Sequence, residues 1–377
     1  VYYAENLNTI MVNLREVRPH IFSTVPRLLE KIYEKILERS EQLPLPQRWI
    51  ARWALRLAVQ YDPDHPMTVP QRVSLVLADR LVYRKWRAAL GGRVRAIISG
   101  SAALQPRLAR IFWAAKMPVY EGYGPTEAAP VVAVNRPRGN HHRIGTVGPI
   151  IPGGEVRIAE DGEILYRGPN VMQGYYLRPD LTAETIDAGG WLHTGDVGAF
   201  DEEFLKITDR KKEVFKTSGG KYIAPQQVEN KFKESRYISQ IMVVGENHKF
   251  PAALIVPNFA ALANALGLQD GASSEREQLL HRPEVKRLFD AEVARLNTNF
   301  GRYLQVKKYA LLPAEWSVAN GELTPTMKMR RKRIAERYAE TIAGLYAGEE
   351  QLTEKLDRYE AAGRHRVEGS LDPSART

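Results

Sequence analysis

Two apolar runs that end in small residues flank one short helical segment between residues 93 and 135. "VRAIISGS" (94–101) and "MPVYEGYG" (117–124) have the composition of buried strands, and "PRLARIFWAAK" between them has helical spacing. Two strands joined through a helix pair in parallel. The carboxyl ends of parallel strands lie at the edge of a sheet where ligands usually bind. The sequence therefore predicts a β-α-β unit over 93–135, with the loops "SGSAA" and "GYGPTE" at its binding edge.

The segments on either side of this unit differ in their patterns of apolar residues and turns. Residues 1–90 are predicted to be mostly helical, and a helical excursion over 27–90 begins with "RLLEKIYEKILERS", whose leucines and isoleucines have helical spacing. Residues 140–208 contain short strand-like runs between Gly and Pro turns, which indicates a small antiparallel barrel or sheet. Residues 1–208 are therefore expected to form the larger domain.

Four consecutive charged residues, "DRKK" at 209–212, are expected to lie exposed at a hinge between two domains. A mixed helix and strand pattern follows, including the helix "PQQVENKFKES" and the hairpin "ISQIMVVGENHKFPAALIVP". We therefore expect a mobile α+β domain over 213–366 and a disordered tail over 367–377. The predicted fold class is α/β plus a β-barrel subdomain, with a smaller α+β C-terminal domain.

Composition excludes some classes of function. The chain has no cysteine, which excludes disulfides, thiolate metal sites and a cysteine nucleophile. It contains neither an apolar run of membrane-spanning length nor a signal-peptide pattern, so a cytoplasmic protein is expected. The net charge of +10 favours anionic partners, namely nucleotides, acidic lipid surfaces or nucleic acid.

The loop "GYGPTE" combines groups that suit a nucleotide. Gly122 and Gly124 permit positive φ or a close approach of the backbone, and Tyr123 between them can offer its ring face to a nucleobase. Thr126 can donate to a phosphate oxygen, and Glu127 can bind a hard cation such as Mg²⁺. From these residues alone, a Gly/Pro turn with a surface glutamate remains an alternative.

Three later motifs each contain one residue of interest. Asp196 in "WLHTGDVG" can accept the two hydroxyls of a ribose, and Arg210 at the charged linker can reach a ribose or a phosphate. Lys328 follows the turn "TPTM", where one amine on a mobile loop would suit an anionic transition state. Taken singly, these residues are equally consistent with a turn aspartate and surface cations.

The order and spacing of the motifs resemble those of the AMP-forming acyl-CoA synthetases, members of the adenylate-forming enzyme family. "YGPTE", "GEILYRGPNVMQGYY", "HTGD", "DRKKEVFKTSGGKYIAPQQVE" and "TPTMK" follow the family's order over nearly the whole chain. The opening "EVRPHIFSTVPRLLEKIYEKI" and the helical excursion look most like the long-chain fatty acid branch. The resemblance implies the adenylate-forming enzyme fold and a long-chain-fatty-acid–CoA ligase activity that uses ATP, Mg²⁺ and CoA.

The resemblance also assigns the residues around the adenine. Tyr123 would stack on the base, and Gly122 and Gly124 would let the backbone approach the base and the acyl group. Ser101 and Ala102 would line the other side of the adenine and the start of the acyl pocket.

The residues around the ribose and the phosphates follow in the same way. Asp196 would hold the ribose hydroxyls with the help of Arg210. Thr126 would bind the α-phosphate, and Glu127 would bind Mg²⁺. Lys328 would bridge the substrate carboxylate and the α-phosphate as charge develops there.

The resemblance implies two half-reactions, in which a fatty acid first forms an acyl-adenylate and CoA then displaces AMP. The small domain would swing at Lys212 between them, and Gly219 and Gly220 of "TSGGK" would flank the thioester tunnel. One departure is the absence of the family's upstream phosphate loop. We therefore expect an N-terminally truncated copy that is inactive or very weak alone, an expectation that robust ATP-dependent thioester formation by residues 1–377 would overturn.

Other functions remain as alternatives. The same fold could activate an aryl, medium-chain or amino acid, because part of the acyl pocket wall would lie upstream. A second alternative, a basic nucleic-acid-binding protein, is suggested by the pI of 9.5 and the run "KMRRKR". No nucleic-acid-binding motif accompanies these features, so nucleic acid is not an expected partner. A non-catalytic fragment is a third alternative. Any membrane contact is expected to be peripheral, and the sequence leaves the oligomeric state open.

Overall fold

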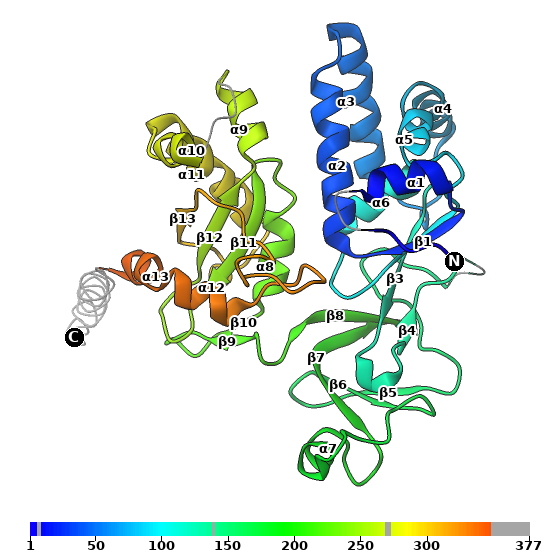
Figure 1. Ribbon diagram of the computed structural model, residues 1–377, viewed down its shortest axis with the longest axis vertical. Coiled ribbons are helices and arrows are strands. Elements are labelled where there is room, and N and C mark those ends of the chain that lie inside the picture. The colour runs from blue at the N-terminus through cyan, green and yellow to red at the C-terminus, as the bar shows by residue number, and fades with distance from the viewer. Residues whose placement is uncertain (6–8, 138, 140, 268–272, 348–377) are drawn as a thin grey trace, which may run out of the picture.

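The computed structural model describes residues 1–5, 9–137, 139, 141–267 and 273–347 (Figure 1). We call residues 1–211 the N-terminal part and residues 212–347 the C-terminal part. The tail predicted over 367–377 lies outside the described residues, as does the end of the predicted 213–366 domain beyond Ala347.

The predicted parallel strand pair is confirmed. Strands β1 (Ile21–Thr24), β2 (Ala96–Ser99) and β3 (Val119–Tyr123) are parallel neighbours, and β4 (Ala133–Val134) adds to β3 in the antiparallel direction. Helix α6 (Pro106–Ala114) connects β2 to β3. The carboxyl ends of β2 and β3, and hence both small-residue loops, therefore lie at the same edge of the sheet.

The N-terminal helices cover this sheet and form the largest apolar core. A single cluster of buried side chains joins helices and strands from Leu14 to Val119. Within it, the Tyr83 hydroxyl donates to the carbonyl of Ala54 at 2.6 Å. The helical elements are α1 (Ile10–Val17), α2 (Pro26–Glu41), α3 (Leu45–Gln60), α4 (Val69–Ala78), a π-helical turn (Asp79–Tyr83) and α5 (Arg84–Ala89).

Residues 1–90 are mostly helical, as predicted, and strand β1 is an element that the sequence did not predict. Its four residues lie between Pro19 and Pro26, and they pair with β2 from Ile21↔Ala96 onwards. The strand is stabilised by this long-range pairing, which the local pattern of the sequence does not reveal.

The predicted barrel or sheet over 140–208 is a four-stranded antiparallel sheet in the order β5-β6-β7-β8. Its apolar cluster includes the fully buried Ile164, Tyr166 and Leu205. The strands are β5 (Glu155–Ile158), β6 (Glu163–Arg167), β7 (Leu192–Asp201) and β8 (Phe204–Arg210), accompanied by α7 (Pro179–Thr185) and the 3₁₀ turn η2 (Thr126–Ala128).

The C-terminal part is the expected mixture of helices and strands. The predicted hairpin forms β11 (Ile238–Val244) and β12 (Ala252–Pro257), and β13 (Lys308–Leu311) extends it in parallel. The remaining elements are β9 (Phe215–Lys216), β10 (Tyr222–Ile223), α8 (Pro225–Phe232), α9 (Phe259–Leu266), α10 (Ser273–Leu280), α11 (Pro283–Asn297), α12 (Arg331–Arg337) and α13 (Ala339–Tyr346).

Both faces of the C-terminal sheet are buried, which explains its continuous apolar strands. Ile241 and Val243 belong to the apolar cluster that contains residues of α8 and α11. Met242 between them belongs to a second cluster with Trp316 and residues of α12 and α13. Alternate residues of β11 therefore pack in opposite directions.

A buried cation joins α12 to α8. The Arg331 guanidinium contacts Glu229 at 2.6 Å and Glu213 at 2.8 Å, and the Glu229 side chain is only 2% exposed. Burial opposes the charged form, but the two carboxylates raise the pKa of Arg331 above its ordinary value. This ion-paired group fixes α12, and hence the turn before it, on the rest of the C-terminal part.

No helix within the described residues is long and apolar enough to cross a membrane.

We expect Arg331→Met to lower the free energy of unfolding by about 3–5 kcal/mol, because Glu229 would keep a buried, uncompensated charge. Urea unfolding followed by circular dichroism measures this change. The matched control is Arg333→Met, since the Arg333–Glu336 pair is exposed at 4.0 Å and should contribute about 1 kcal/mol or less. Equal effects of the two substitutions would contradict the account.

Candidate active site

Three residues from distant motifs meet where the ends of β3 and β8 adjoin the middle of β7. The Tyr123 hydroxyl donates to Asp196 Oδ2 at 2.8 Å, and the Arg210 Nε lies 3.2 Å from Asp196 Oδ1. Asp196 and Arg210 are direct partners in the β7–β8 pairing. The structure thus brings together the predicted aromatic ring, the ribose acceptor and the linker arginine.

Burial shapes the electrostatics of this group. Asp196 is 6% exposed, and burial raises the pKa of its carboxyl, although Tyr123, Arg210 and Lys328 oppose the change. Burial and the neighbouring Asp196 charge raise the pKa of the Tyr123 phenol. Tyr123 therefore remains a hydrogen-bond donor that orients Asp196 at neutral pH.

The C-terminal part contributes Lys328 to the same group. Burial lowers the pKa of the Lys328 amine, and the positive charge of Arg210 adds to this effect, whereas Asp196 and Glu213 oppose it. Lys328 lies in a turn closed by the Thr324 N–H bonded to the Lys328 carbonyl at 2.8 Å. In Figure 1 the orange chain before α12 extends toward the N-terminal part, as these interactions require.

Thr126 and Glu127 occupy the 3₁₀ turn η2 directly after the Tyr123 loop. Thr126 is exposed, and Glu127 is half-buried. The Tyr175 hydroxyl donates to Glu127 Oε1 at 2.7 Å, which leaves Oε2 without a hydrogen bond from any described residue. A single oriented carboxylate with one free oxygen fits Mg²⁺ that takes its other ligands from phosphate and water. Within the described residues, no group of three His, Cys, Asp or Glu could hold a metal by itself.

Ser101 and Ala102 lie exposed in the loop after β2, and Ser101 has the left-handed φ of 74°. This loop adjoins the end of β3, where the predicted "GYGPTE" loop begins, because a Cβ on Gly100 would lie 3.7 Å from the Gly122 carbonyl oxygen. The two predicted loops are therefore neighbours.

Of the two properties expected of these glycines, positive φ or a close approach of the backbone, the structure shows the close approach at Gly124. Neither Gly122 nor Gly124 has a positive φ. A Cβ on Gly124 would lie 2.2 Å from the Pro130 carbonyl oxygen, whereas a Cβ on Gly122 would meet Val134 at an ordinary 3.5 Å. Gly124 is thus required for the loop to close on itself.

The predicted hinge is only partly exposed. Lys212 is exposed, but Asp209 is 1% exposed within β8, contrary to the expectation for four charged residues at a linker. Asp209 Oδ2 accepts from the Gln226 N–H at 2.9 Å, and its carboxylate therefore caps the first turn of α8. This side-chain bond across the linker is why Asp209 is buried.

Gly219 and Gly220 lie in the turn between β9 and β10. Gly220 has a φ of 78°, and the structure gives neither glycine a contact with Tyr123, Asp196 or Lys328 among the described residues. They are therefore not part of the assembled group.

Sequence reasoning did not assign Glu121, which lies two residues before Tyr123 in β3. It is 8% exposed, and its Oε2 accepts from the Leu104 N–H at 3.2 Å, which ties the Ser101 loop to β3. A charged residue inside an apolar strand is the signal that could have identified it. Tyr175, the partner of Glu127, had no such signal in the sequence.

Glu121 predicts a pH dependence of stability. Burial raises the pKa of its carboxyl to about 8, although the Leu104 N–H opposes this. Because the folded protein favours the protonated Glu121, this residue's contribution to the free energy of unfolding is fully present below pH 4.5, the ordinary pKa of the carboxyl. The contribution is lost as the pH rises through about 8. At 1.36 kcal/mol per pH unit, the loss is at most about 5 kcal/mol.

We therefore expect Glu121→Gln to gain stability relative to the unmodified protein between pH 5.5 and 8.5. Urea unfolding at the two pH values measures this difference, and Glu203→Gln on the exposed β7–β8 turn is the control. If the difference in free energy of unfolding between the Glu121→Gln variant and the unmodified protein is the same at both pH values, Glu121 is not a buried neutral acid.

Comparison with known proteins places this geometry in a family. Residues 2–176 match the family described as AMP-binding enzyme, and residues 212–350 match the AMP-binding enzyme C-terminal domain. Asp196 and Arg210 fall between the two matches.

Curated relatives cover most of the chain. It is 36% identical over 353 residues to long-chain-fatty-acid–CoA ligase FadD15 of Mycobacterium bovis, across 92% of this chain and 58% of that protein. It is 32% identical over 362 residues to human long-chain-fatty-acid–CoA ligase 1, across 92% of this chain and 50% of that protein. The chain thus spans about half to three-fifths of the length of these relatives.

Solved structures show the same fold. The A-PCP didomain of carboxylic acid reductase from Segniliparus rugosus, in complex with AMP, matches 99% of this chain and 47% of that chain, with a TM-score of 0.68 and 24% identity. The anthranilate CoA ligase AuaEII matches 88% of this chain and 52% of that chain, with a TM-score of 0.57 and 17% identity. The fold predicted from the motifs is confirmed, and the chain belongs to the AMP-binding enzyme family, the adenylate-forming enzymes.

Proposed function

We propose that the protein activates a long-chain fatty acid with ATP and transfers the acyl group to CoA. In the first half-reaction, a carboxylate oxygen attacks the α-phosphorus of ATP, and the bond to the bridging oxygen breaks to release pyrophosphate. In the second, the CoA thiolate attacks the acyl carbon, and the carbon–oxygen bond to AMP breaks. The products are acyl-CoA, AMP and pyrophosphate.

The observation that carries this proposal is the approach of Lys328 to Asp196 and Arg210, which lie beside Tyr123. Two cations, Lys328 and Arg210, lie near the buried Asp196 carboxylate and would attract a phosphate group. The cations come from different parts of the chain. A site with a ribose acceptor and two cations suits a substrate in which a nucleoside is joined to an anionic reacting group.

The adenosine would occupy the loops after β2 and β3. The Tyr123 ring would stack on the adenine, and Ser101 and Ala102 would line its other side and the start of the acyl pocket. The Asp196 oxygens each accept one bond, from Tyr123 and Arg210, and a carboxylate has further lone pairs for two ribose hydroxyls. Gly122 would let the backbone approach the base.

The phosphates would lie beyond the ribose. Thr126 would donate to the α-phosphate, and Lys328 would bridge this phosphate and the substrate carboxylate as charge develops. Glu127, oriented by Tyr175, would hold Mg²⁺. When bound, Mg²⁺ would neutralise phosphate charge. The residues of the chain position two anions and offset their repulsion, which is the main catalytic task in such a transfer.

The second half-reaction would need a different arrangement of the two parts. We propose that the C-terminal part swings about Lys212, which is exposed two residues after the end of β8. Gly219 and Gly220, on the exposed turn between β9 and β10, would then flank the tunnel for CoA.

The names of the relatives support a long-chain acid over an aryl, medium-chain or amino acid, because the curated proteins described above are long-chain-fatty-acid–CoA ligases. A long acyl chain partitions into bilayers, and the net charge of +10 favours an anionic surface. We therefore also propose peripheral membrane contact.

The membrane contact has its own test. The protein should sediment with vesicles that contain anionic lipid at low ionic strength and dissociate as salt screens the charges. Neutral vesicles are the control. Failure to sediment with anionic vesicles at low salt would contradict the proposal.

The activity is tested with the purified gene product, ATP, Mg²⁺ and CoA, together with acids of graded chain length. AMP and thioester should rise together for long-chain acids. Lys328→Ala should slow adenylation by roughly 100-fold or more, as expected when one transition-state contact is lost. Lys332→Ala, which removes an exposed lysine of the same basic run, is the matched control.

Turnover only with aryl or amino acids would retain the adenylate site and overturn the fatty-acid assignment. Equal rates for Lys328→Ala and Lys332→Ala would overturn the role of Lys328. The absence of AMP with any acid would overturn the proposed activity.

A further inference from the structure

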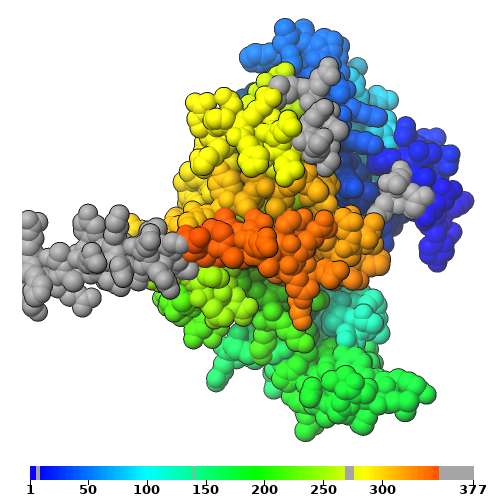
Figure 2. Space-filling view, turned by 60° about the vertical axis from the view of Figure 1, so that its left-hand side comes forward, coloured from blue at the N-terminus to red at the C-terminus, as the bar shows by residue number. Residues whose placement is uncertain are grey.

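Hydrogen bonds and ion pairs connect the N-terminal and C-terminal parts, and a few apolar side chains, such as Leu37 and Ile238, lie at the same junction. Each cluster of buried apolar side chains in the described residues belongs to one part alone, since two lie within residues 14–205 and two within residues 228–346. Figure 2 shows the yellow and orange C-terminal part beside both the blue helices and the green sheet. A polar contact of this kind can separate without exposing a hydrophobic core.

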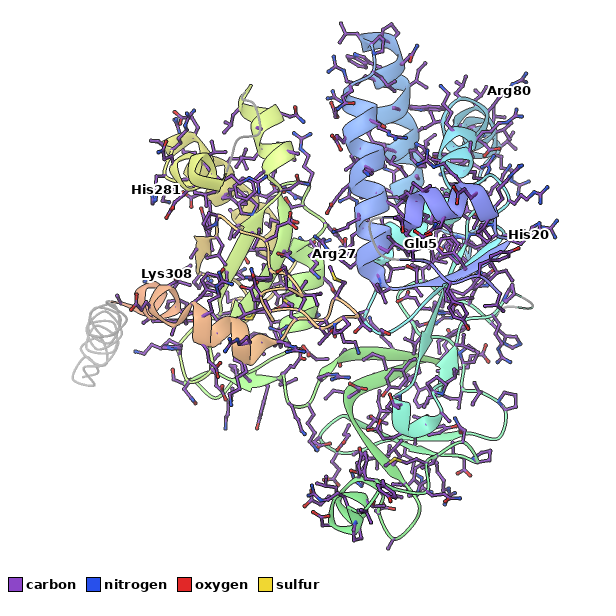
Figure 3. All side chains as sticks on the ribbon, in the orientation of Figure 1. Glu5, His20, Arg27, Arg80, His281 and Lys308 are labelled. Carbon is purple, nitrogen blue, oxygen red and sulfur yellow. The ribbon has the colours of Figure 1, made fainter. Side chains whose placement is uncertain are left out.

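Arg27 at the start of α2 is a half-buried interface cation, with 13% of its side chain exposed. Its Nη1 and Nη2 donate at 3.2 Å to the carbonyl and the hydroxyl of Ser239, at the start of β11. It also contacts Glu30 at 2.9 Å and Glu34 at 3.6 Å. Figure 3 shows Arg27 between α2 and the C-terminal part. Two of its acceptor atoms therefore come from across the interface.

Arg107 of α6 makes a second connection. Its Nη2 donates to the Tyr33 hydroxyl at 2.6 Å, and its Nη1 donates to the Glu234 carbonyl, just beyond the end of α8. The carboxyl end of a helix carries partial negative charge that favours a cation. In a further ion pair the cation comes from the C-terminal part: Lys233, next to Glu234, lies 4.0 Å from Glu30 of α2.

A hollow of about 50 Å³ lies among these groups. Arg27, Arg107 and Lys233 line it together with the apolar side chains of Leu37, Leu108 and Ile238. The interface is thus charged and incompletely filled. Both guanidinium groups hold one short segment, residues 234–239, which joins α8 to β11.

The assembled site places like charges on the two parts. Arg210 of the N-terminal part repels Lys328 of the C-terminal part, whereas Asp196 and Glu213 attract Lys328. Before an anionic substrate binds, other contacts must support the orientation in which Lys328 faces Asp196.

We propose that Arg27 and Arg107 form a latch that holds the C-terminal part in the adenylate-forming orientation and must release segment 234–239 before CoA is used. This inference rests on the proposed function, because the two half-reactions define the two orientations of the C-terminal part. The latch acts through neutral backbone and hydroxyl acceptors together with the Lys233–Glu30 attraction. It positions Lys328 and has no contact with the reacting atoms.

The absence of cysteine from the chain allows a direct test. Glu203→Cys and Glu340→Cys place one spin label on an exposed position of each part, and pulsed electron paramagnetic resonance measures the distance between them. The latch predicts one narrow distance distribution. The combined Arg27→Met and Arg107→Met substitutions should broaden it or add a second distance, whereas Arg39→Met on the exposed face of α2 should not.

A broad distribution in the unmodified background, or a narrow one that survives both latch substitutions, would overturn the proposal. If the arginine variants fail to fold, Lys233→Glu replaces them, because it sets a carboxylate against Glu30 at a partly exposed position. Broadening would support the latch, and an unchanged distribution in a folded variant would overturn it.

The gene product supplies a second readout. Loss of the latch should slow single-turnover adenylation on the order of tenfold, while CoA transfer from supplied acyl-adenylate stays equal or becomes faster. Equal losses in both halves would indicate general damage and overturn the positioning role. If the gene product makes no adenylate, the proposed function fails, and the distance measurement still decides whether the latch exists.

Discussion

The carboxylate of Asp196 is the point at which distant parts of the chain meet. It lies in β7, accepts from the Tyr123 hydroxyl at the end of β3, and pairs with Arg210 of β8. A buried carboxylate is costly unless such partners compensate it, so the first sheet and the antiparallel sheet are held in register where the nucleotide would bind. Lys328 of the C-terminal part then adds a positive charge near this carboxylate.

The way in which the two parts of the chain meet suits a two-step reaction. Each part has its own apolar core, and hydrogen bonds and ion pairs connect them. An apolar interface would fix one arrangement, whereas polar contacts exchange with water at modest free-energy cost. Rigidity resides within each part, where Arg331 and its two carboxylates fix the turn that carries Lys328.

The sequence predicted most of the elements, because hydrophobic period and turn chemistry are local properties, and it selected Tyr123, Asp196 and Arg210, which the fold brings together. It missed β1, whose four residues are stabilised by pairing with β2. It also predicted an exposed Asp209, which is buried because it caps a helix 16 residues further along the chain. The approach of Lys328 to Asp196 depends on how two separately folded parts dock, and no local pattern encodes that orientation.

The central claim is that Tyr123 and Asp196 form an adenosine site, and the affinity of the 377-residue chain for AMP tests it most directly. Isothermal titration calorimetry should detect AMP binding that Asp196→Asn weakens by about 10- to 100-fold, since a hydrogen bond to a charged group contributes about 1.5–3 kcal/mol. Glu203→Gln, on the exposed turn of the same sheet, should bind as the unmodified chain does. Equal affinities in the unmodified chain and the Asp196→Asn variant would contradict the assignment of this site.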